Sequence, residues 1–541
     1  MLYDLVLYGG SVIDGTGNRR VEADVAIRNG RIERVGNAIG PAKRSIDIGG
    51  LAVAPGFIDM HSHSDMSFLN VPAAATKIEQ GVTTEVVGQC GISPAPVNEA
   101  FRDELKKYAF EGAGIGSSCS FRDYLKSLET KPLSTNIVQL VGQGTVRIAV
   151  MGLDSRPPSK QEMERMKSLV ADALDAGAYG LSTGLIYPPG EWSDTEELLS
   201  LLQVVAGFSG GYYNTHVRGE GHTVMEGWQE AIELGRRAGI AVQISHAKAA
   251  GRENWGKSAA CIQLVEAAQA DGLDITFDCY PFTRTGGSLS TLLPNWVKEG
   301  GSAKLAQRLS MPKVRKQIRM DIRDNAFIWN PIGYSTSYLR QWDNPWLLIA
   351  GPTQEQHSHM TGKSMLDIAA SLKTDPLEVI FDMLIEGDDA RVVLDLMDEK
   401  DVQNFVRCPT GMIGTDCQSF AAGAHPSEGN PHPRCFSTFP RVLAKYVRDE
   451  QVLSLEQAVH KMTGLAAKRI GLHDRGTIAQ GNIADLVVFD PGQIQDQATF
   501  DRAWQRPLGI HYVLVNGCTC VENGRFSGDT AGQVLRRTDT A

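Results

Sequence analysis

The stretch GFIDMHSHSD, residues 56–65, is an apolar run that ends in two histidines. Residues 57–60 have the character of a buried β-strand, and packing gives such a strand no reason to end in His61 and His63. In an extended chain, residues i and i+2 lie on the same side, so the two imidazoles can bind one ion together. The stretch therefore predicts a buried strand that carries a metal site at its carboxyl end.

The middle of the chain repeats a short apolar strand followed by a helical segment. The helical segments 160–177 and 225–239 both end at glycine, as helix C-termini commonly do. Eight such strands with helices between them predict a (β/α)8 barrel, with a three-layer open sheet as the alternative. The predicted strands span residues 56–61, 82–88, 136–142, 178–183, 212–216, 241–246, 273–278 and 411–416.

The two ends of the chain differ from the middle. Short strands with Asn-Gly turns, such as Asn29-Gly30 and Asn523-Gly524, predict antiparallel β-structure at both ends. We expect residues 1–54 and 476–541 to form one small β-sandwich and residues 55–475 to form the barrel. The long gap between the seventh and eighth strands predicts an insertion over the barrel mouth at about residues 285–345. Its aromatic residues fit a lid that excludes water, or a contact in a homo-oligomer; they are Trp296, Trp329, Tyr334, Tyr338 and Trp342.

Composition narrows the classes of function. The chain has 541 residues, which is too long for one ordinary core, with 42% hydrophobic and 21% charged residues. The net charge is −10 and no basic block stands out, so nucleic acid is not expected as a partner. No apolar run is long enough to cross a membrane, and the first residues lack the pattern of a signal peptide. The nine cysteines are an odd and scattered set, which favours reduced thiols in a cytoplasmic protein over a disulfide framework.

Several predicted strands end in residues that can bind a metal. Imidazole, thiolate and carboxylate are the usual ligands of zinc, and in a barrel the carboxyl ends of all strands lie on one face. A single histidine is more often a hydrogen-bonded polar residue, and a single cysteine is more often a small buried hydrophobe. The combination of four strand-end histidines out of 12 favours a metal centre. The candidate residues are His61, His63, Cys90, His216, His246 and Asp416.

Longer stretches carry a family resemblance. The sequence from residue 3 to about 517 resembles the amidohydrolase superfamily and, within it, the N-acyl-D-amino-acid deacylase (D-aminoacylase) family. The stretches that carry the resemblance are GFIDMHSHSD (56–65), QGVTTEVVGQCGIS (80–93), THVRGEG (215–221), ISHAKAAG (244–251), FDCYPF (277–282), HPR (432–434) with the FSTFPRVLAKYVRDE that follows, and the segment 453–491.

The resemblance implies a role for each candidate residue. His61 and His63 would bind one zinc ion, Cys90 would replace a bridging carboxylated lysine, and His216 with His246 would bind the other metal position, so that one or two ions are held. Asp416 would be the general acid and base. Lys248, Tyr280, Ser288 and Arg434 would meet the carboxylate of an N-acyl-D-amino acid. Lysine and arginine are natural carboxylate partners by chemistry alone, although most of them are solvated surface charges.

Some residues depart from the family's pattern. Cys417 follows Asp416 where glycine or alanine is common, and Cys435 stands where alanine usually follows His-Pro-Arg. Neither change removes a ligand, so the departures bear on substrate specificity more than on hydrolysis. One alternative is therefore the same site acting on another amide: a xenobiotic, a cyclic amide or an N-acyl amine. The other is a non-catalytic scaffold, which would be expected to have lost ligands.

Overall fold

A closed barrel of parallel strands lies at the centre of the computed structural model, which describes residues 2–37, 39–73, 75–106, 118–324, 347–421 and 430–537. The last strand meets the first, because the amide of Met60 donates to the carbonyl of Ile413 at 3.2 Å and Ser62 bridges to Cys417. This closure confirms the (β/α)8 prediction and excludes the open sheet. The third of the eight barrel strands is split into two short strands. The barrel strands are β6 (Phe57–Asp59), β7 (Val82–Val87), β8 (Asn136–Gln139) with β9 (Val141–Gly142), β10 (Gly180–Gly184), β11 (Tyr212–His216), β12 (Ala241–Ile244), β13 (Ile275–Cys279) and β17 (Gly411–Ile413).

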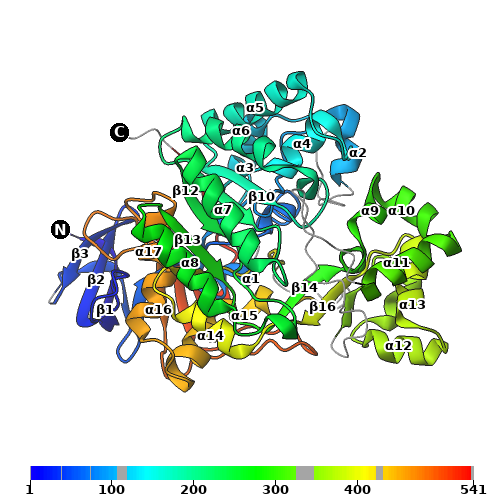
Figure 1. The fold of residues 1–541 in the computed structure, drawn as a ribbon. Helices are drawn as coiled ribbons and strands as arrows, with labels where there is room; N and C mark the ends of the chain where they lie inside the picture. The colour runs from blue at the N-terminus through cyan, green and yellow to red at the C-terminus, as the bar shows by residue number, and fades with distance from the viewer. Residues whose placement is uncertain are drawn as a thin grey trace.

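Helices cover the outside of the barrel (Figure 1). In α5 (Lys160–Asp175), Ser159 and Glu162 form a capping box that satisfies the free amides of the first turn. Helix α7 (Val224–Ala238) ends at Gly239, whose φ of 69° is left-handed, as a helix C-terminus favours. Among the described residues, no helix is both long and apolar enough to cross a bilayer. The other helices around the barrel are α1 (Ala75–Ile78), α2 (Arg102–Leu105), α3 (Phe121–Glu129), α4 (Gln143–Met151), α6 (Thr195–Ala206), α8 (Ser258–Ala270), α14 (Glu399–Arg407), α15 (Arg434–Arg441), α16 (Leu455–Met462) and α17 (Gly464–Arg469).

Strands from both termini form a second β-structure, as predicted. It has its own apolar core, and β5 leads through Gly56 directly into the first barrel strand. Only glycine fits there, because a Cβ on Gly56 would lie 2.2 Å from the side chain of Thr83. The pairing is not purely antiparallel: β1 pairs with β2 antiparallel but with β4 and β5 in parallel. The strands are β1 (Tyr3–Val12), β2 (Val21–Arg28), β3 (Arg31–Gly36), β4 (Ala42–Asp47), β5 (Ala52–Pro55), β18 (Leu486–Phe489), β19 (Ile510–Val515), β20 (Cys518–Glu522) and β21 (Arg525–Phe526). The chain then leaves this sheet, and β22 (Val534–Leu535) pairs with β8.

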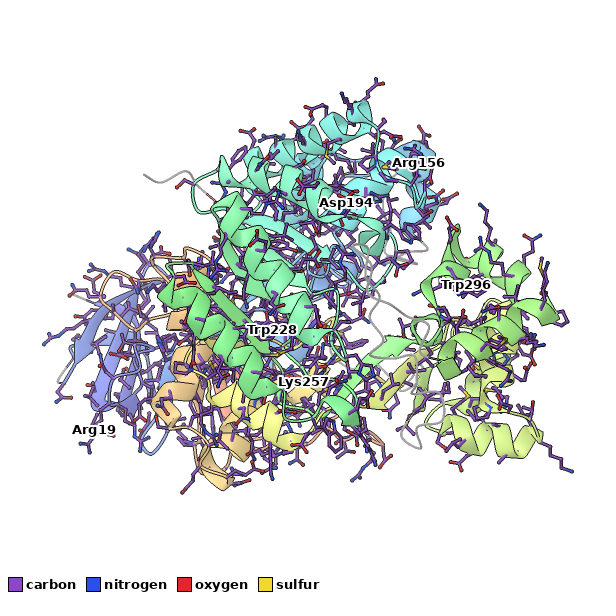
Figure 2. The ribbon with its side chains drawn as sticks, in the orientation of Figure 1. Arg19, Arg156, Asp194, Trp228, Lys257 and Trp296 are labelled. Carbon is purple, nitrogen blue, oxygen red and sulfur yellow. A yellow bond between two sulfur atoms is a disulfide. The ribbon has the colours of Figure 1, made fainter. Side chains whose placement is uncertain are left out.

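A lobe stands beside the barrel, at the right of Figure 1, between the seventh and eighth barrel strands. Its antiparallel sheet has the order β14-β16-β15 and so extends past the expected insertion to Asp395. Trp296 lies on this lobe (Figure 2) and donates to Asp321 at 2.9 Å. Trp329, Tyr334, Tyr338 and Trp342 lie outside the described residues. The elements are β14 (Arg284–Ser288), β15 (Leu348–Gly351), β16 (Arg391–Asp395), α9 (Asn295–Lys298), α10 (Gly301–Leu309), α11 (Pro312–Asp324), α12 (Met365–Leu372) and α13 (Pro376–Ile385).

Candidate metal centre and active site

Three of the strand-end residues have left-handed backbones that turn them out of their strands. The φ angles of Cys90, His246 and Asp416 are 54°, 33° and 48°. Non-glycine residues rarely adopt this region, and the surrounding structure must hold them there. It does so for two of them: the amide of His246 donates to Asp278 at 2.8 Å, and that of Asp416 donates to the carbonyl of His61 at 2.7 Å. The backbone is thus fixed in the conformation that aims these side chains at the barrel axis.

The sulfur of Cys90 lies at the centre of three imidazoles. It is 3.3 Å from Nε2 of His61, 3.6 Å from Nδ1 of His216 and 3.5 Å from Nε2 of His246. Tetrahedral zinc with ordinary Zn–S and Zn–N bonds separates its ligands by about 3.4–3.6 Å. The donor atoms therefore have both the chemistry and the spacing of a zinc site.

His63 and Asp416 extend this cluster on one side. Nε2 of His63 lies 3.3 Å from Oδ1 of Asp416, and Nε2 of His61 lies 3.6 Å from the same oxygen. Donor atoms of His61, His63 and Asp416 all fall within 4.8 Å of one another, as do those of His61, Cys90 and His246. The two sets share His61, so the cluster has donors for one or two cations.

The electrostatics of the cluster favour a cation. Burial alone would raise the pKa of the Cys90 thiol, but the imidazoles of His61 and His246 lower it well below its ordinary value. Burial would lower the pKa of His63, yet its hydrogen bonds to Asp416 and Cys90 raise it to about 9. A buried thiolate beside a carboxylate favours the cationic form of the neighbouring imidazoles. The same negative electrostatic potential favours the binding of a divalent cation.

Glu220 is a site residue that the sequence analysis missed. Its Oε1 lies 3.2 Å from Nε2 of His216 and 3.2 Å from Nδ1 of His246, on the ring sides turned away from Cys90. It also accepts from Nζ of Lys248 at 2.7 Å. Burial would raise the pKa of Glu220, but His216 and Lys248 lower it well below its usual range, so it is ionised. Metal-binding histidines almost always donate their second N–H to such an acceptor.

Tyr187 was also missed. Its hydroxyl lies 3.0 Å from Nδ1 of His216, and its ring is in edge contact with that imidazole. Asp278 lies 3.3 Å from Nδ1 of His61, where its carboxylate can orient that ring.

Asp416 and Arg434 form an ion pair at the edge of the cluster. Nη1 of Arg434 lies 2.8 Å from Oδ2 of Asp416, and its guanidinium stacks 4.8 Å from the centre of the Tyr280 ring. Burial would raise the pKa of Asp416, but Arg434 and the neighbouring imidazoles lower it well below its usual range. Nζ of Lys248 lies 5.6 Å from the centre of the same ring. The two predicted carboxylate partners thus share one aromatic support.

A cavity of about 640 Å³ opens over these groups. Its wall combines the ends of the barrel strands with β14, α10 and β16 of the lobe. Ser288 lines it from β14 and interacts with Asp389 at 3.2 Å. His61 and Tyr280 do not line the cavity and lie behind it. The predicted residues that do line it are His63, Cys90, His216, His246, Lys248, Ser288, Asp416 and Arg434.

The structure pairs Cys417 with Cys435 in a disulfide, with Cα atoms 5.3 Å apart. The expectation that all thiols are reduced is therefore wrong for this pair, and holds for the seven other cysteines. Both members line the cavity beside Asp416 and Arg434.

Comparisons with known proteins agree with this geometry. The profile of the Amidohydrolase family matches residues 44–286 and 412–521. A D-aminoacylase of Alcaligenes xylosoxydans xylosoxydans is 36% identical over 99% of this chain and 98% of its own length. This chain belongs to the amidohydrolase family. Within that family it belongs with the N-acyl-D-amino-acid deacylases, because an N-acyl-D-glutamate deacylase of the same organism is also 36% identical, over 99% of this chain and 96% of its own.

A solved relative extends the comparison to three dimensions. N-acyl-D-glutamate deacylase from Bordetella bronchiseptica, complexed with zinc and a phosphonate inhibitor that mimics the tetrahedral intermediate, is 31% identical. The two structures superpose with a TM-score of 0.81, and the match covers 99% of this chain and 100% of the deacylase chain. The barrel, the terminal β-structure and the lobe thus recur together in an amidohydrolase that binds zinc.

Proposed function

We propose that this protein is a zinc-dependent hydrolase of N-acyl-D-amino acids that releases a carboxylate and a free D-amino acid. The observation that carries the proposal is the convergence of Cys90 with three imidazoles beside the Asp416–Arg434 ion pair. The activities of the curated deacylases at 36% identity support the reaction class and the D configuration.

The metal ligands are proposed from the same geometry. His216 and His246 would hold one ion, and His61 and His63 would hold the second, with the Cys90 sulfur placed beside His61, His216 and His246 as a further donor. When bound, zinc supplies Lewis acidity, which lowers the pKa of water to about 7 and polarises an amide carbonyl. One or two ions fit this set of donors.

Asp416 is the group placed to move the proton. Its lowered pKa keeps it ionised at neutral pH, and it lies within 3.6 Å of both imidazoles of the His-x-His pair. Asp416 would accept a proton from the attacking water and deliver it to the nitrogen of the leaving amine, so that the C–N bond breaks as a neutral amine forms.

Three residues, Arg434, Lys248 and Ser288, would bind the substrate's carboxylate, and Tyr280 would support two of them. Nη1 of Arg434 pairs with Asp416, while Nη2 lies beside Gly286. A Cβ atom on residue 286 would lie only 3.6 Å from Nη2. The missing side chain at Gly286 leaves this nitrogen open to a substrate carboxylate. Lys248 and Ser288 line the same cavity, and Tyr280 supports both cations from behind.

We also propose a cytoplasmic location, which the seven unpaired cysteines among the described residues support. The lobe surface would be the contact if the protein forms a homo-oligomer. The expected partner is a small amide, and neither nucleic acid nor membrane is proposed.

Steady-state hydrolysis of matched N-acetyl-D- and N-acetyl-L-amino acids and one neutral aryl amide tests the function, with zinc quantified in the same preparation. Strong preference for the D series with bound zinc is the expected result. Turnover of the neutral amide alone would move the protein to another amide substrate, and absence of zinc and of all turnover would leave a non-catalytic scaffold.

A further inference from the structure

The Cys417–Cys435 disulfide links the two residues that directly follow the partners of the Asp416–Arg434 ion pair. Cys417 comes directly after Asp416 and Cys435 directly after Arg434, and the two cysteines are 18 residues apart in sequence. The bond thus ties the loop that follows β17 to the first turn of α15. Both cysteines stand where the sequence pattern leads one to expect a smaller residue.

The surroundings hold the backbone of both cysteines independently of the bond. Buried Lys77 donates to the carbonyl of Cys417 at 2.8 Å, and buried Gln80 donates to that of Cys435 at 2.9 Å. Opening the disulfide would therefore change the local spacing of the two segments without removing their support. Two unbonded thiols must lie roughly 1.5 Å farther apart than bonded sulfurs, because van der Waals contact replaces the covalent distance.

Such a displacement would move Arg434 relative to Asp416, because each is adjacent in sequence to one of the two cysteines. Arg434 reaches Asp416 at 2.8 Å from one side and lies over Tyr280 at 4.8 Å, so it has a fixed place in the cavity wall. A shift of about 1 Å is enough to misplace a group that binds a substrate in a bidentate way. Both cysteines line the cavity, but Cys435 is fully buried whereas Cys417 is half-buried, so a small thiol reaches the bond at the sulfur of Cys417.

We propose that the Cys417–Cys435 disulfide is a positioning clamp that holds Arg434 for recognition of the substrate carboxylate, and that its redox state sets the KM for carboxylate substrates. This role rests on the proposed function. A low-molecular-weight thiol opens the clamp in two steps. Its thiolate attacks the Cys417 sulfur and forms a mixed disulfide, and the Cys435 thiolate leaves and takes up a proton. A second thiol then releases Cys417 as a thiol, and two reductant thiols end as one disulfide.

Thiol counting is the first test. Full-length protein purified without reductant and denatured in the presence of a thiol reagent should give seven reactive thiols, and nine after reduction. Nine thiols at the outset would overturn the clamp.

The second test separates KM from kcat. The zinc-loaded enzyme is assayed before and after treatment with reduced glutathione, with zinc quantified in each sample, on its best N-acetyl-D-amino acid and on a neutral amide of the same acyl group. Reduction should raise the KM for the carboxylate substrate at least fivefold, change kcat by less than twofold, and leave the KM of any neutral amide turned over unchanged. Cys435→Ala should show the raised KM without glutathione and no further response, whereas Cys518→Ser, an exposed free thiol on β20, should behave as wild type.

The two proposals fail differently. No deacylase activity in the oxidised, zinc-loaded enzyme would refute the proposed function, and the carboxylate role of the clamp with it. Deacylase activity with the same KM in both redox states, or a KM that rises equally for both substrates, would refute the clamp alone.

Discussion

Glu220→Gln tests whether one carboxylate orients two metal ligands. For His246 to bind zinc through Nε2, its Nδ1 must carry the proton and donate it. Two groups compete for that Nδ1: Oε1 of Glu220, an acceptor at 3.2 Å, and Nζ of Lys248, a donor at 2.8 Å. The Glu220 charge favours the protonated Nδ1, and hence the tautomer that binds metal. In the variant, the ammonium of Lys248 still lies beside this nitrogen, and it favours the wrong tautomer.

The expected size of the effect follows from these contacts. Loss of a hydrogen-bonding partner behind one metal-binding histidine typically weakens metal affinity about 10–100-fold. Because Glu220 serves both His216 and His246, we expect the upper end, about 100-fold or roughly 2.7 kcal/mol. Lys248 is also fully buried, and removing its partner leaves an uncompensated charge that costs about 3–5 kcal/mol of folding free energy.

Chelator competition on the metal-free protein measures the zinc affinity, and denaturant unfolding measures stability. The double variant Glu220→Gln/Lys248→Met should recover most of the stability, because it removes the unpaired buried cation. It should also recover part of the zinc affinity, because Lys248 no longer favours the His246 tautomer that cannot bind zinc through Nε2. Glu226→Gln, an exposed glutamate at the start of α7, is the matched control and should change neither quantity. Zinc affinity within twofold of wild type in Glu220→Gln would refute the orienting role.

Four further outcomes are expected. Asp416→Asn should keep its zinc but lose at least 100-fold in kcat, and near-normal turnover would contradict its role in proton transfer. Arg434→Ala should raise the KM for N-acyl-D-amino acids far more than for a neutral amide, and an equal rise would remove Arg434 from the carboxylate site. Dialysis against a chelator should abolish hydrolysis with little change in far-UV circular dichroism, and zinc should restore it; activity that survives complete metal removal would refute metal dependence. Burial raises the pKa of Glu191 to about 7 from 4.5, and the folded state then binds a proton more tightly than the unfolded state. Stability should therefore fall by up to about 3 kcal/mol as the pH rises from about 4 to 8, and Glu191→Gln should remove this dependence in pH-resolved unfolding.

The barrel and the clustering of its candidate metal donors could be predicted because both depend on short-range sequence pattern. Each barrel strand is a brief apolar run, and the donors lie at its end or just after it, as His216 ends β11 and His61 follows β6. The closure of the barrel then brings together residues that sequence alone can only place at strand ends.

Glu220, Tyr187 and the disulfide depend on long-range geometry, and this is why the sequence did not predict them. Glu220 follows His216 by four residues in a loop, where no periodicity says which way an acidic side chain points. Cys417 and Cys435 are 18 residues apart, and an odd cysteine count gives no pairing. The C-terminal boundary of the lobe was missed for a similar reason. Strand β14 pairs with β16, which lies more than a hundred residues later in the chain, so this boundary depends on a long-range contact and not on a local sequence signal.

Hydrogen bonds within the barrel hold the backbone that carries the candidate donors. Asp59 accepts from the amides of His61 and Thr415, and Lys77 donates to it at 2.6 Å, so the first and last barrel strands are joined by a buried network directly beneath the donors. Left-handed residues at strand ends each cost about 1–3 kcal/mol, and only such over-determined contacts can hold them. Because the network fixes the backbone of His61 and the position of Asp416, the spacing of the donors belongs to the fold itself. Residues around the cavity, such as Cys417 and Cys435, can therefore vary while the donors stay in place, and we expect such changes to alter how a substrate is held.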